Sequence, residues 1–321
     1  MIGRLERKVL SGGEVSREEA ISLSSVPAED VFDLFSAANR IRGRFRGKVI
    51  DICAIINAKS GGCPEDCSYC AQSSRSSSDT PVFPLIGKGQ VLEKAAEAKH
   101  GGARRFCIVT SGRKVSDAEI RQIADMISGV RALGLLPCAT LGLLGKDELL
   151  FLKDSGLERF HHNIETSERY FPEICTTHTY SDKLKTIAAV TSAGLSLCSG
   201  GIFGLGETWQ DRIDMGIALR EIGPDSVPLN FLIPISGTRL GSIARLGPFE
   251  ALRIVSLFRF LLPDKEIRIC GGRMQTLGEF NSFIFFAGAD GLLSGNYLTT
   301  TGRSFEDDAS LIAKYGLEIA G

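Results

Sequence analysis

The sequence lacks a hydrophobic run long enough to cross a membrane, and it has almost no net charge. Its 321 residues include 37 lysines and arginines against 38 aspartates and glutamates, which gives a formal net charge of −1. This balance argues against a general affinity for nucleic acid. Apolar runs well short of about 18–20 residues exclude a membrane-spanning helix. Residues 1–13 mix charged and isolated apolar residues, so we expect no signal peptide and a cytoplasmic protein.

Cysteine, in contrast, is abundant, and its number argues against a disulfide framework. The chain has nine cysteines but only one tryptophan and four histidines. An odd number of thiols in a large chain without an export signal favours reduced cysteines that bind a metal or a cluster. The hydrophobic fraction of 43% and the charged fraction of 23% are typical of a folded globular protein. The cysteines are Cys53, Cys63, Cys67, Cys70, Cys107, Cys138, Cys175, Cys198 and Cys270.

From residue 49 onwards, short apolar runs alternate with amphipathic stretches of helical period. The runs predict strands at 49–57, 104–111, 136–144, 158–166, 195–204, 226–235, 266–271 and 291–295. Such alternation is typical of the α/β class and predicts a (β/α)8 TIM-type barrel domain over 49–321, with an open doubly wound sheet as the alternative. Residues 1–48 predict an N-terminal helical extension, in which Ser16 and Glu19 form a capping box.

Several of the predicted strands carry polar residues and cysteines two positions apart. Side chains at positions i and i+2 of a strand point to the same face. The pairs are Arg105 with Cys107, Cys138 with Thr140, Asn163 with Glu165, Ser196 with Cys198, and Arg268 with Cys270. Barrel interiors are normally filled with Val, Ile and Leu, and buried polar groups need partners. If these faces point inward, the barrel contains a polar cavity lined by cysteines.

A compact cysteine triplet follows the first predicted strand. Cys63, Cys67 and Cys70 have the spacing C-x3-C-x2-C in a glycine-containing loop. Three thiolates so close in sequence can bind one iron–sulfur cluster and leave one iron open to another ligand. A structural zinc site is the alternative, but such a site requires four ligands. His100 and the pair His161 and His162 are distant in the sequence, which disfavours zinc.

The triplet, with Tyr69 before its last cysteine, resembles the signature of the radical S-adenosylmethionine (SAM) superfamily. The resemblance implies a [4Fe–4S] cluster on Cys63, Cys67 and Cys70, with SAM on the open iron as the source of a 5′-deoxyadenosyl radical. Gly200-Gly-Ile-Phe-Gly-Leu-Gly-Glu207 is similar to that superfamily's G-x-I-x-G-x-x-E segment. The residues implied in SAM binding are Tyr69, Thr110, Ser111, Gly112, Glu165, Gly201, Ile202 and Gly204.

Within the superfamily, nearly the whole chain resembles the biotin synthases. Stretches that carry the resemblance include Asn57 to Ser73, Arg105-Phe-Cys107, Cys138-Ala-Thr-Leu-Gly142, His162 to Thr166, Cys198-Ser-Gly-Gly201, Ser226 to Asn230 and Ile267-Arg268. The resemblance implies sulfur insertion into dethiobiotin to form biotin, with the sulfur drawn from an auxiliary [2Fe–2S] cluster. Its implied ligands are Cys107, Cys138, Cys198 and Arg268. Cys270, two residues after Arg268, could replace that arginine and give an all-cysteine cluster of another composition.

The same resemblance assigns the substrate and the partners. Asn163 and Asn230 match positions that bind the ureido group, and Thr300 and Thr301 match the segment near the substrate carboxylate. A low-potential electron donor of the flavodoxin or ferredoxin type and a homodimer are family expectations. Cys53 and Cys175 have no family role, and we expect both to be structural and buried. The alternatives are another barrel-type radical SAM enzyme, such as a maturase or mutase, and a non-catalytic metal-binding protein.

Overall fold

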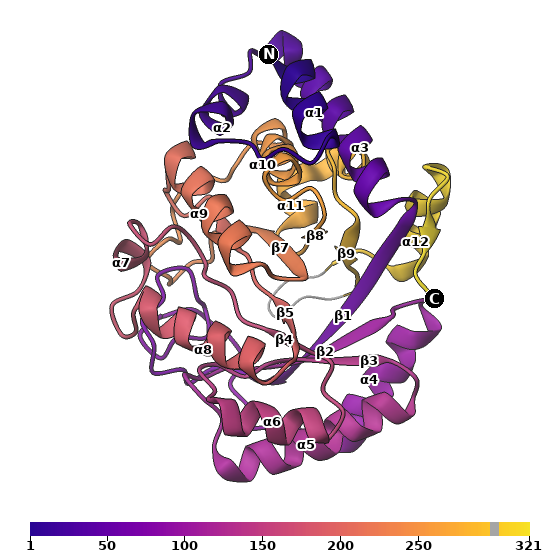
Figure 1. Ribbon diagram of the computed structural model, residues 1–321. Helices are drawn as coiled ribbons and strands as arrows, with labels where there is room; N and C mark the ends of the chain where they lie inside the picture. Colours follow the sequence, from indigo (N-terminus) through magenta and orange to yellow (C-terminus); the bar gives the residue numbers. More distant parts are fainter. Residues whose placement is uncertain (296–301) are drawn as a thin grey trace.

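The strands form a closed barrel with parallel pairing throughout in the computed structural model, which describes residues 1–295 and 302–321 (Figure 1). β1 pairs with β2 on one side and with β9 on the other, and this pairing closes the ring. The predicted barrel is therefore confirmed, and the open sheet is wrong. The strands are β1 (Val49–Lys59), β2 (Arg105–Thr110), β3 (Leu136–Thr140), β4 (Arg159–His161), β5 (Ser196–Cys198), β6 (Gly201–Phe203), β7 (Ser226–Phe231), β8 (Glu266–Ile269) and β9 (Gly291–Leu293).

The fifth position of the barrel is split between β5 and β6, where the sequence predicts one strand over 195–204. Both short strands pair with β7; Ser199 and Gly200 join them, and Gly201 begins β6. A Cβ atom on Gly200 would lie 2.1 Å from the Pro228 carbonyl oxygen, and one on Gly201 would lie 2.2 Å from the Glu165 carbonyl oxygen. The neighbouring backbones approach so closely that only glycine fits. A further short strand, β10 (Glu318–Ile319), which the sequence pattern does not predict, pairs with the start of β1.

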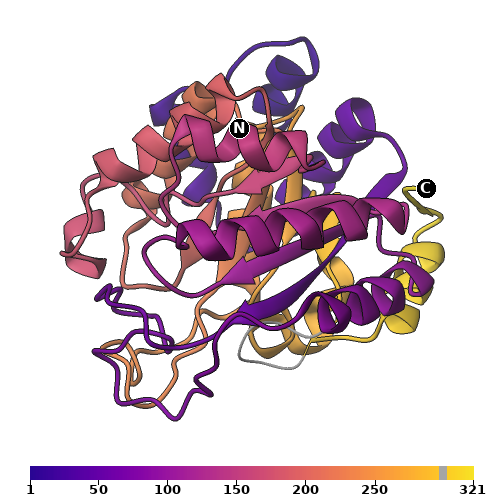
Figure 2. The same ribbon diagram turned by 90° about the horizontal axis from the view of Figure 1, so that it is seen from below.

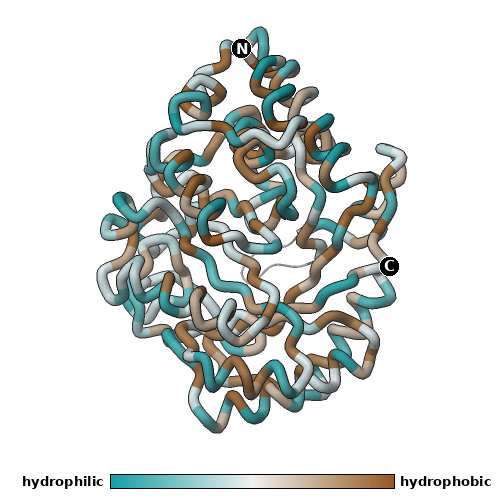
Figure 3. The backbone as a smooth tube through the Cα atoms, in the orientation of Figure 1, coloured by the Kyte–Doolittle hydropathy of each residue, from teal (hydrophilic) through white to brown (hydrophobic). Residues whose placement is uncertain are grey.

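Helices cover the outside of the barrel, and teal and brown segments alternate along them in Figure 3. Figure 2 shows several of them lying across the outer face of the strands. Ser116, Thr179 and Thr208 cap three of these helices by accepting a backbone N–H with their side-chain oxygens. The helices after β1 are α4 (Lys88–His100), α5 (Asp117–Ala132), α6 (Lys146–Asp154), α7 (Phe171–Ile174), α8 (Tyr180–Ser192), α9 (Trp209–Ile222), α10 (Pro248–Leu261), α11 (Arg273–Leu277) and α12 (Phe305–Lys314).

Three helices precede the barrel: α1 (Ile2–Leu10), α2 (Arg17–Ser24) and α3 (Val31–Arg46). α3 packs on α1 and α10, and α2 packs on α9 and α10 (Figure 1). The predicted capping box is confirmed, because Ser16 accepts the Glu19 N–H and Glu19 accepts the Ser16 N–H. Within the described ranges, no helix has the length and apolar character that crossing a membrane requires.

We predict that the close approach at the β5–β6 junction makes Gly201→Ala destabilising. The added methyl would contact the Glu165 carbonyl and the Met215 side chain, so the free energy of unfolding should fall by about 1–3 kcal/mol. Gly43→Ala is the matched control, because Gly43 is exposed in the last turn of α3 with no atom near its Cβ position. That change should stabilise the protein by about 1 kcal/mol. Urea denaturation measures both; equal midpoints for the two variants would contradict the prediction.

Candidate functional site

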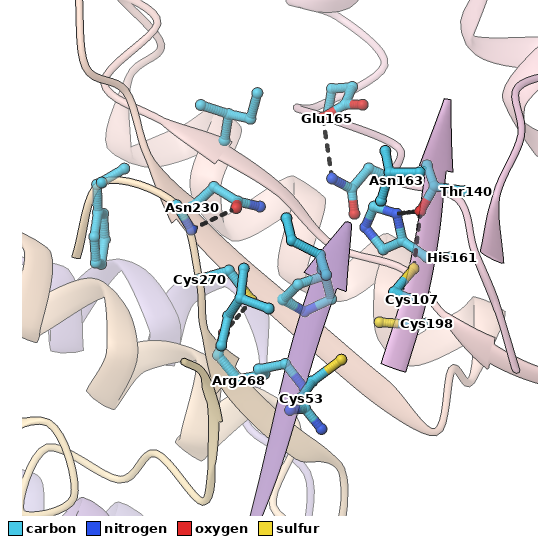
Figure 4. Close-up of a pocket in the computed structure, with 18 of the residues that line it drawn as sticks. Cys53, Cys107, Thr140, His161, Asn163, Glu165, Cys198, Asn230, Arg268 and Cys270 are labelled. Atoms are coloured by element: carbon cyan, nitrogen blue, oxygen red, sulfur yellow. Dashed lines mark hydrogen bonds between the residues drawn. The ribbon is translucent and has the colours of Figure 1, made fainter. Parts of the chain in front are cut away.

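The side chains of the predicted polar strand pairs, with the exception of Ser196, line one cavity of about 340 Å³ inside the barrel (Figure 4). Along each strand the inward side chains lie in layers, because every second residue faces the same way. In β1, for example, Cys53 and Ile55 face inward, and Asp51 precedes them. The predicted site residues that line the cavity are Tyr69, Cys107, Cys138, Asn163, Glu165, Cys198, Ile202, Asn230, Arg268 and Cys270.

The innermost layer of the barrel is an ion network. The Arg268 Nη2 atom lies 2.5 Å from the Asp51 carboxylate and also contacts the Glu266 carboxylate. Glu266 is further paired with Arg159, and Asp51 with Arg105. Burial opposes ionisation of Glu266, but the adjacent Arg268 and Arg159 hold the pKa of this carboxyl at about 2. The floor of the cavity is therefore charged and rigid.

A layer of five cysteines lies directly above this network. All five side chains are more than nine-tenths buried. Burial raises the pKa of the Cys198 thiol to about 11 and that of Cys270 to about 12. A hydrogen bond with Cys53 lowers the pKa of Cys138 to about 7, aided by the nearby arginines. The five are Cys53, Cys107, Cys138 and Cys198, from four different strands, and Cys270, directly after β8.

Cys53 is the member of this layer that sequence reasoning missed. It was expected to be a structural thiol, yet it lines the same cavity as the four cysteines predicted for the site. The spacing in β1 contained the signal, because Cys53 follows Asp51 by two residues as Cys107 follows Arg105 and Cys270 follows Arg268. The thiol layer thus has one more potential metal ligand than predicted.

Two asparagines form part of the upper wall. Asn163 accepts the Gly200 N–H at 3.0 Å and donates to Glu165 at 3.3 Å. Asn230 accepts the Gly271 N–H at 2.9 Å and donates to the Gly201 carbonyl at 3.1 Å. An amide side chain has two donor hydrogens and two acceptor lone pairs, so each asparagine keeps one of each for a ligand. Their orientations are fixed by the backbone of neighbouring strands.

The cysteine triplet lies in the long loop between β1 and α4. The Cys70 N–H donates to the Cys67 carbonyl, and the Cys63 N–H donates to the Gln72 carbonyl, so the loop folds back on itself. Part of this loop lies beside the loop after β7, through the Ser77 N–H and the Gly237 carbonyl (Figure 2). Cys67 and Cys70 line a second, smaller cavity of about 230 Å³. Tyr69, between them, reaches into the large cavity.

The remaining residues predicted to bind SAM do not line the large cavity. Thr110 and Ser111 are buried at the end of β2, and the Ser111 hydroxyl donates to the Gly61 carbonyl at 2.8 Å. This bond anchors the start of the cysteine loop. Gly112 and Gly204 have positive φ angles of 112° and 91°, which glycine adopts without strain. Gly201 lies at the β5–β6 junction, and Thr300 and Thr301 lie outside the described residues.

The thiol layer fits an anionic iron–sulfur cluster. Cluster ligands are thiolates, and their negative charge needs compensation in a buried site. Arg105, Arg159 and Arg268 line the cavity next to the thiols. The Nη1 atom of Arg105 is buried without a hydrogen-bond partner in the described structure, so it can still bond to an anion. The loop triplet fits a second cluster, since its three thiols come from eight consecutive residues.

Comparisons with known proteins agree with this geometry. Residues 58–216 match the radical SAM superfamily, and residues 228–318 match the Biotin and Thiamin Synthesis associated domain. Methylornithine synthase has a TM-score of 0.86 at 19% identity, covering 99% of this chain and 97% of that one. A FeFe-hydrogenase maturase from Carboxydothermus hydrogenoformans has a TM-score of 0.83 at 18% identity, covering 99% and 79%. These two likenesses show the fold.

The barrel and its cysteine loop, together with the matching segment, define a radical SAM enzyme. Two curated relatives identify the family within this class of enzymes. The biotin synthase of Thermodesulfovibrio yellowstonii is 54% identical over 289 residues, covering 90% of this chain and 91% of the relative. That of Pelotomaculum thermopropionicum is 43% identical over 322 residues, covering 99% and 100%. The chain belongs to the biotin synthase family.

The ion network predicts a strong effect of Glu266→Gln on stability. Removing this charge leaves Arg268 and Arg159 buried with less compensation, so the free energy of unfolding of the cluster-free protein should fall by about 3–5 kcal/mol. Glu93→Gln is the control, since Glu93 is exposed on α4, and it should change stability by less than about 0.5 kcal/mol. Guanidinium denaturation measures the difference. A loss no larger than that of the control would show that the network does not hold the barrel together.

Proposed function

We propose that this chain converts dethiobiotin to biotin by inserting one sulfur atom between two unactivated carbons. The observation that carries the proposal is that the thiol layer and Tyr69, from the loop of the cysteine triplet, line the same cavity. Tyr69, between two cysteines of the triplet, lines its rim, and the thiol layer forms its lower wall. A substrate in this cavity lies between two potential clusters. Radical chemistry is required because such C–H bonds have no acidic proton.

We assign the [4Fe–4S] cluster to Cys63, Cys67 and Cys70, and SAM to the residues predicted for it above. When bound, these groups supply a radical able to take hydrogen from an unactivated C–H bond, and the auxiliary cluster supplies sulfur. The chain's own residues position the substrate and exclude water. The free donor and acceptor of Asn163 and Asn230 suit a cyclic urea, which has paired N–H and C=O groups.

For the auxiliary cluster, we propose that Cys270 rather than Arg268 is the fourth ligand beside Cys107, Cys138 and Cys198. The Arg268 guanidinium donates to two carboxylates and to the Leu292 carbonyl, at 2.8 Å. Burial opposes its charge, but Glu266 and Asp51 raise its pKa well above the usual value, and a protonated guanidinium has no lone pair for iron. The Cys270 thiol has only a weak contact, 3.9 Å from the Arg268 carbonyl. Arg268 then compensates the charge of the thiolates.

The other assignments follow the family. We propose a low-potential electron donor of the flavodoxin or ferredoxin type, a homodimer and a cytoplasmic location. We also propose that residues 1–48 are an extension and that residues 49–321 form the catalytic domain. Packing of α3 on α10 supports an extension that is fixed to the barrel.

The two cysteine groups should separate the two halves of the reaction. Under anaerobic conditions, with SAM, dethiobiotin and a low-potential reductant, the reconstituted protein should form both 5′-deoxyadenosine and biotin. Cys67→Ser should abolish both products, because it removes a ligand of the radical-generating cluster. Cys138→Ser should keep 5′-deoxyadenosine formation and abolish biotin. Mass spectrometry measures both products. Absence of both products from iron-replete wild-type protein, or their joint loss in Cys138→Ser, would contradict the proposal.

The fourth ligand can be tested in a chain that holds only the auxiliary cluster. In a background of Cys63→Ser, Cys67→Ser and Cys70→Ser, all bound iron and sulfide belongs to the barrel. Adding Cys270→Ser should lower both at least twofold, since a ligand is lost. Adding Arg268→Lys, which keeps the charge between Asp51 and Glu266, should leave both unchanged. Full iron content in the Cys270 variant, with loss in the Arg268 variant, would reverse the assignment.

A further inference from the structure

A second group of side chains that can bind a metal lies beside the cysteine loop. Cys175 and His178, in the segment between α7 and α8, pack against Cys67. One ligand atom from each of the three residues lies within 4.8 Å of the other two. Cys175 and His178 are more than nine-tenths buried. Nothing in the proposed reaction uses Cys175 or His178, and sequence reasoning expected Cys175 to be only structural.

The distances in this group match tetrahedral coordination of one ion. With metal–sulfur bonds of about 2.3 Å and metal–nitrogen bonds of about 2.0 Å, the edges of a tetrahedron are about 3.8 Å between two sulfurs and about 3.5 Å between sulfur and nitrogen. The Cys67 and Cys175 Sγ atoms are 3.8 Å apart. The two ring nitrogens of His178, Nδ1 and Nε2, lie 3.3 Å and 3.8 Å from the Cys175 Sγ atom. Little rearrangement is needed to hold an ion.

The surroundings of His178 are those of a metal-binding histidine. The buried Glu65 carboxylate contacts Nδ1 of His178, and the Thr177 hydroxyl donates to the same carboxylate oxygen at 2.7 Å. A ligating histidine usually donates its other ring N–H to a carboxylate, which fixes the tautomer and the ring orientation. With Glu65 on Nδ1, the free ring nitrogen is Nε2. The carboxylate is an observation independent of the spacing of the three ligands.

Asp66 holds the Cys175 segment in position, and we do not assign it as a ligand. Its Oδ1 atom lies 3.4 Å from the Cys175 Sγ atom, but it accepts the backbone N–H groups of Thr176 and Thr177 at 2.8 and 3.2 Å. These bonds tie the Cys175 segment to the cysteine loop. The protein therefore offers two sulfurs and one nitrogen, and the fourth position of a tetrahedral ion is left for water.

We propose that Cys67, Cys175 and His178 bind a single tetrahedral divalent transition-metal ion, Zn²⁺ or Fe²⁺, in the chain that has not yet received its [4Fe–4S] cluster. This proposal rests on the proposed function in one respect: Cys67 is also assigned to the cluster, so the ion and the cluster exclude each other. Sulfur and nitrogen sites bind Zn²⁺ more tightly than Fe²⁺. Zinc at this position therefore blocks assembly of the cluster, whereas iron there is already next to the triplet.

Optical titration with Co²⁺, which reports tetrahedral thiolate sites, tests the ion site. The metal-free, reduced chain with Cys63→Ser and Cys70→Ser has no complete triplet but keeps the three proposed ligands. We expect it to bind one more Co²⁺ per chain, with ligand-field and thiolate charge-transfer bands, than the same chain with Cys175→Ser or His178→Gln. His162→Gln, at another buried histidine, is the matched control for His178→Gln and should keep that ion. Equal Co²⁺ content with and without Cys175 would overturn the site.

Competition between Zn²⁺ and cluster assembly tests whether the ion and the [4Fe–4S] cluster exclude each other. In a chain with Cys107→Ser, Cys138→Ser and Cys198→Ser, one equivalent of Zn²⁺ added before iron and sulfide should slow [4Fe–4S] formation at least tenfold. Cys175→Ser should remove that delay. An equal delay in both chains would mean that zinc acts elsewhere and would overturn the exclusion. Normal cluster formation in Cys67→Ser would instead contradict the proposed function, while the Co²⁺ result would still stand.

Discussion

The structure depends on a buried ion network that closes the barrel below the site. Arg268 donates to both Asp51 and Glu266, and these carboxylates also bind Arg105 and Arg159. Charges buried in a protein are costly unless each has a partner and hydrogen bonds. Here they occupy a level of the barrel that aliphatic side chains usually fill. Three arginines against two carboxylates leave an excess of positive charge directly under the thiol layer.

This excess of positive charge explains why so many cysteines can occupy one interior. Burial raises the pKa of Cys198 and Cys270 far above neutrality, so each thiolate needs nearby cations or a metal. The arginines supply the nearby cations. Asn163 and Asn230, on the other side of the thiol layer, supply directed hydrogen bonds without charge. Along the barrel axis, the ion network is thus followed by the thiol layer, and the thiol layer by the two asparagines. That order places a sulfur-rich region against the part of the cavity suited to a small polar substrate.

Much of the fold and the site could be predicted from the sequence, because strand alternation is a local property. The pairs Arg105 with Cys107 and Arg268 with Cys270 predicted inward faces correctly, since both members of each pair line the cavity. Cys53 was missed because its immediate neighbours, Ile52 and Ala54, are apolar, and because the spacing from Asp51 was the only sign of a polar inward face. Cys175 meets Cys67 across 108 residues of sequence, and no local pattern predicts such a contact.

The sequence pattern also does not predict that the fifth strand is divided into β5 and β6. This division follows from the approach of the Pro228 and Glu165 carbonyls to Gly200 and Gly201, which only the closed barrel creates. The carboxylates that hold Arg268 come from β1 and from its own strand. The sequence alone does not show that Asp51 is a partner of Arg268, because the two residues meet only in a closed barrel, where β1 pairs with β9. Long-range pairing therefore determines which carboxylates bind the Arg268 guanidinium.

The proposed reaction requires a second cluster in the barrel, separate from the one in the loop. The most direct measurement is an iron anomalous difference map from crystals of the reconstituted protein. We expect two groups of iron peaks, one at Cys63, Cys67 and Cys70 and one within bonding distance of Cys107, Cys138 and Cys198. Iron at the loop alone, with the thiol layer empty in protein that forms biotin, would contradict this requirement.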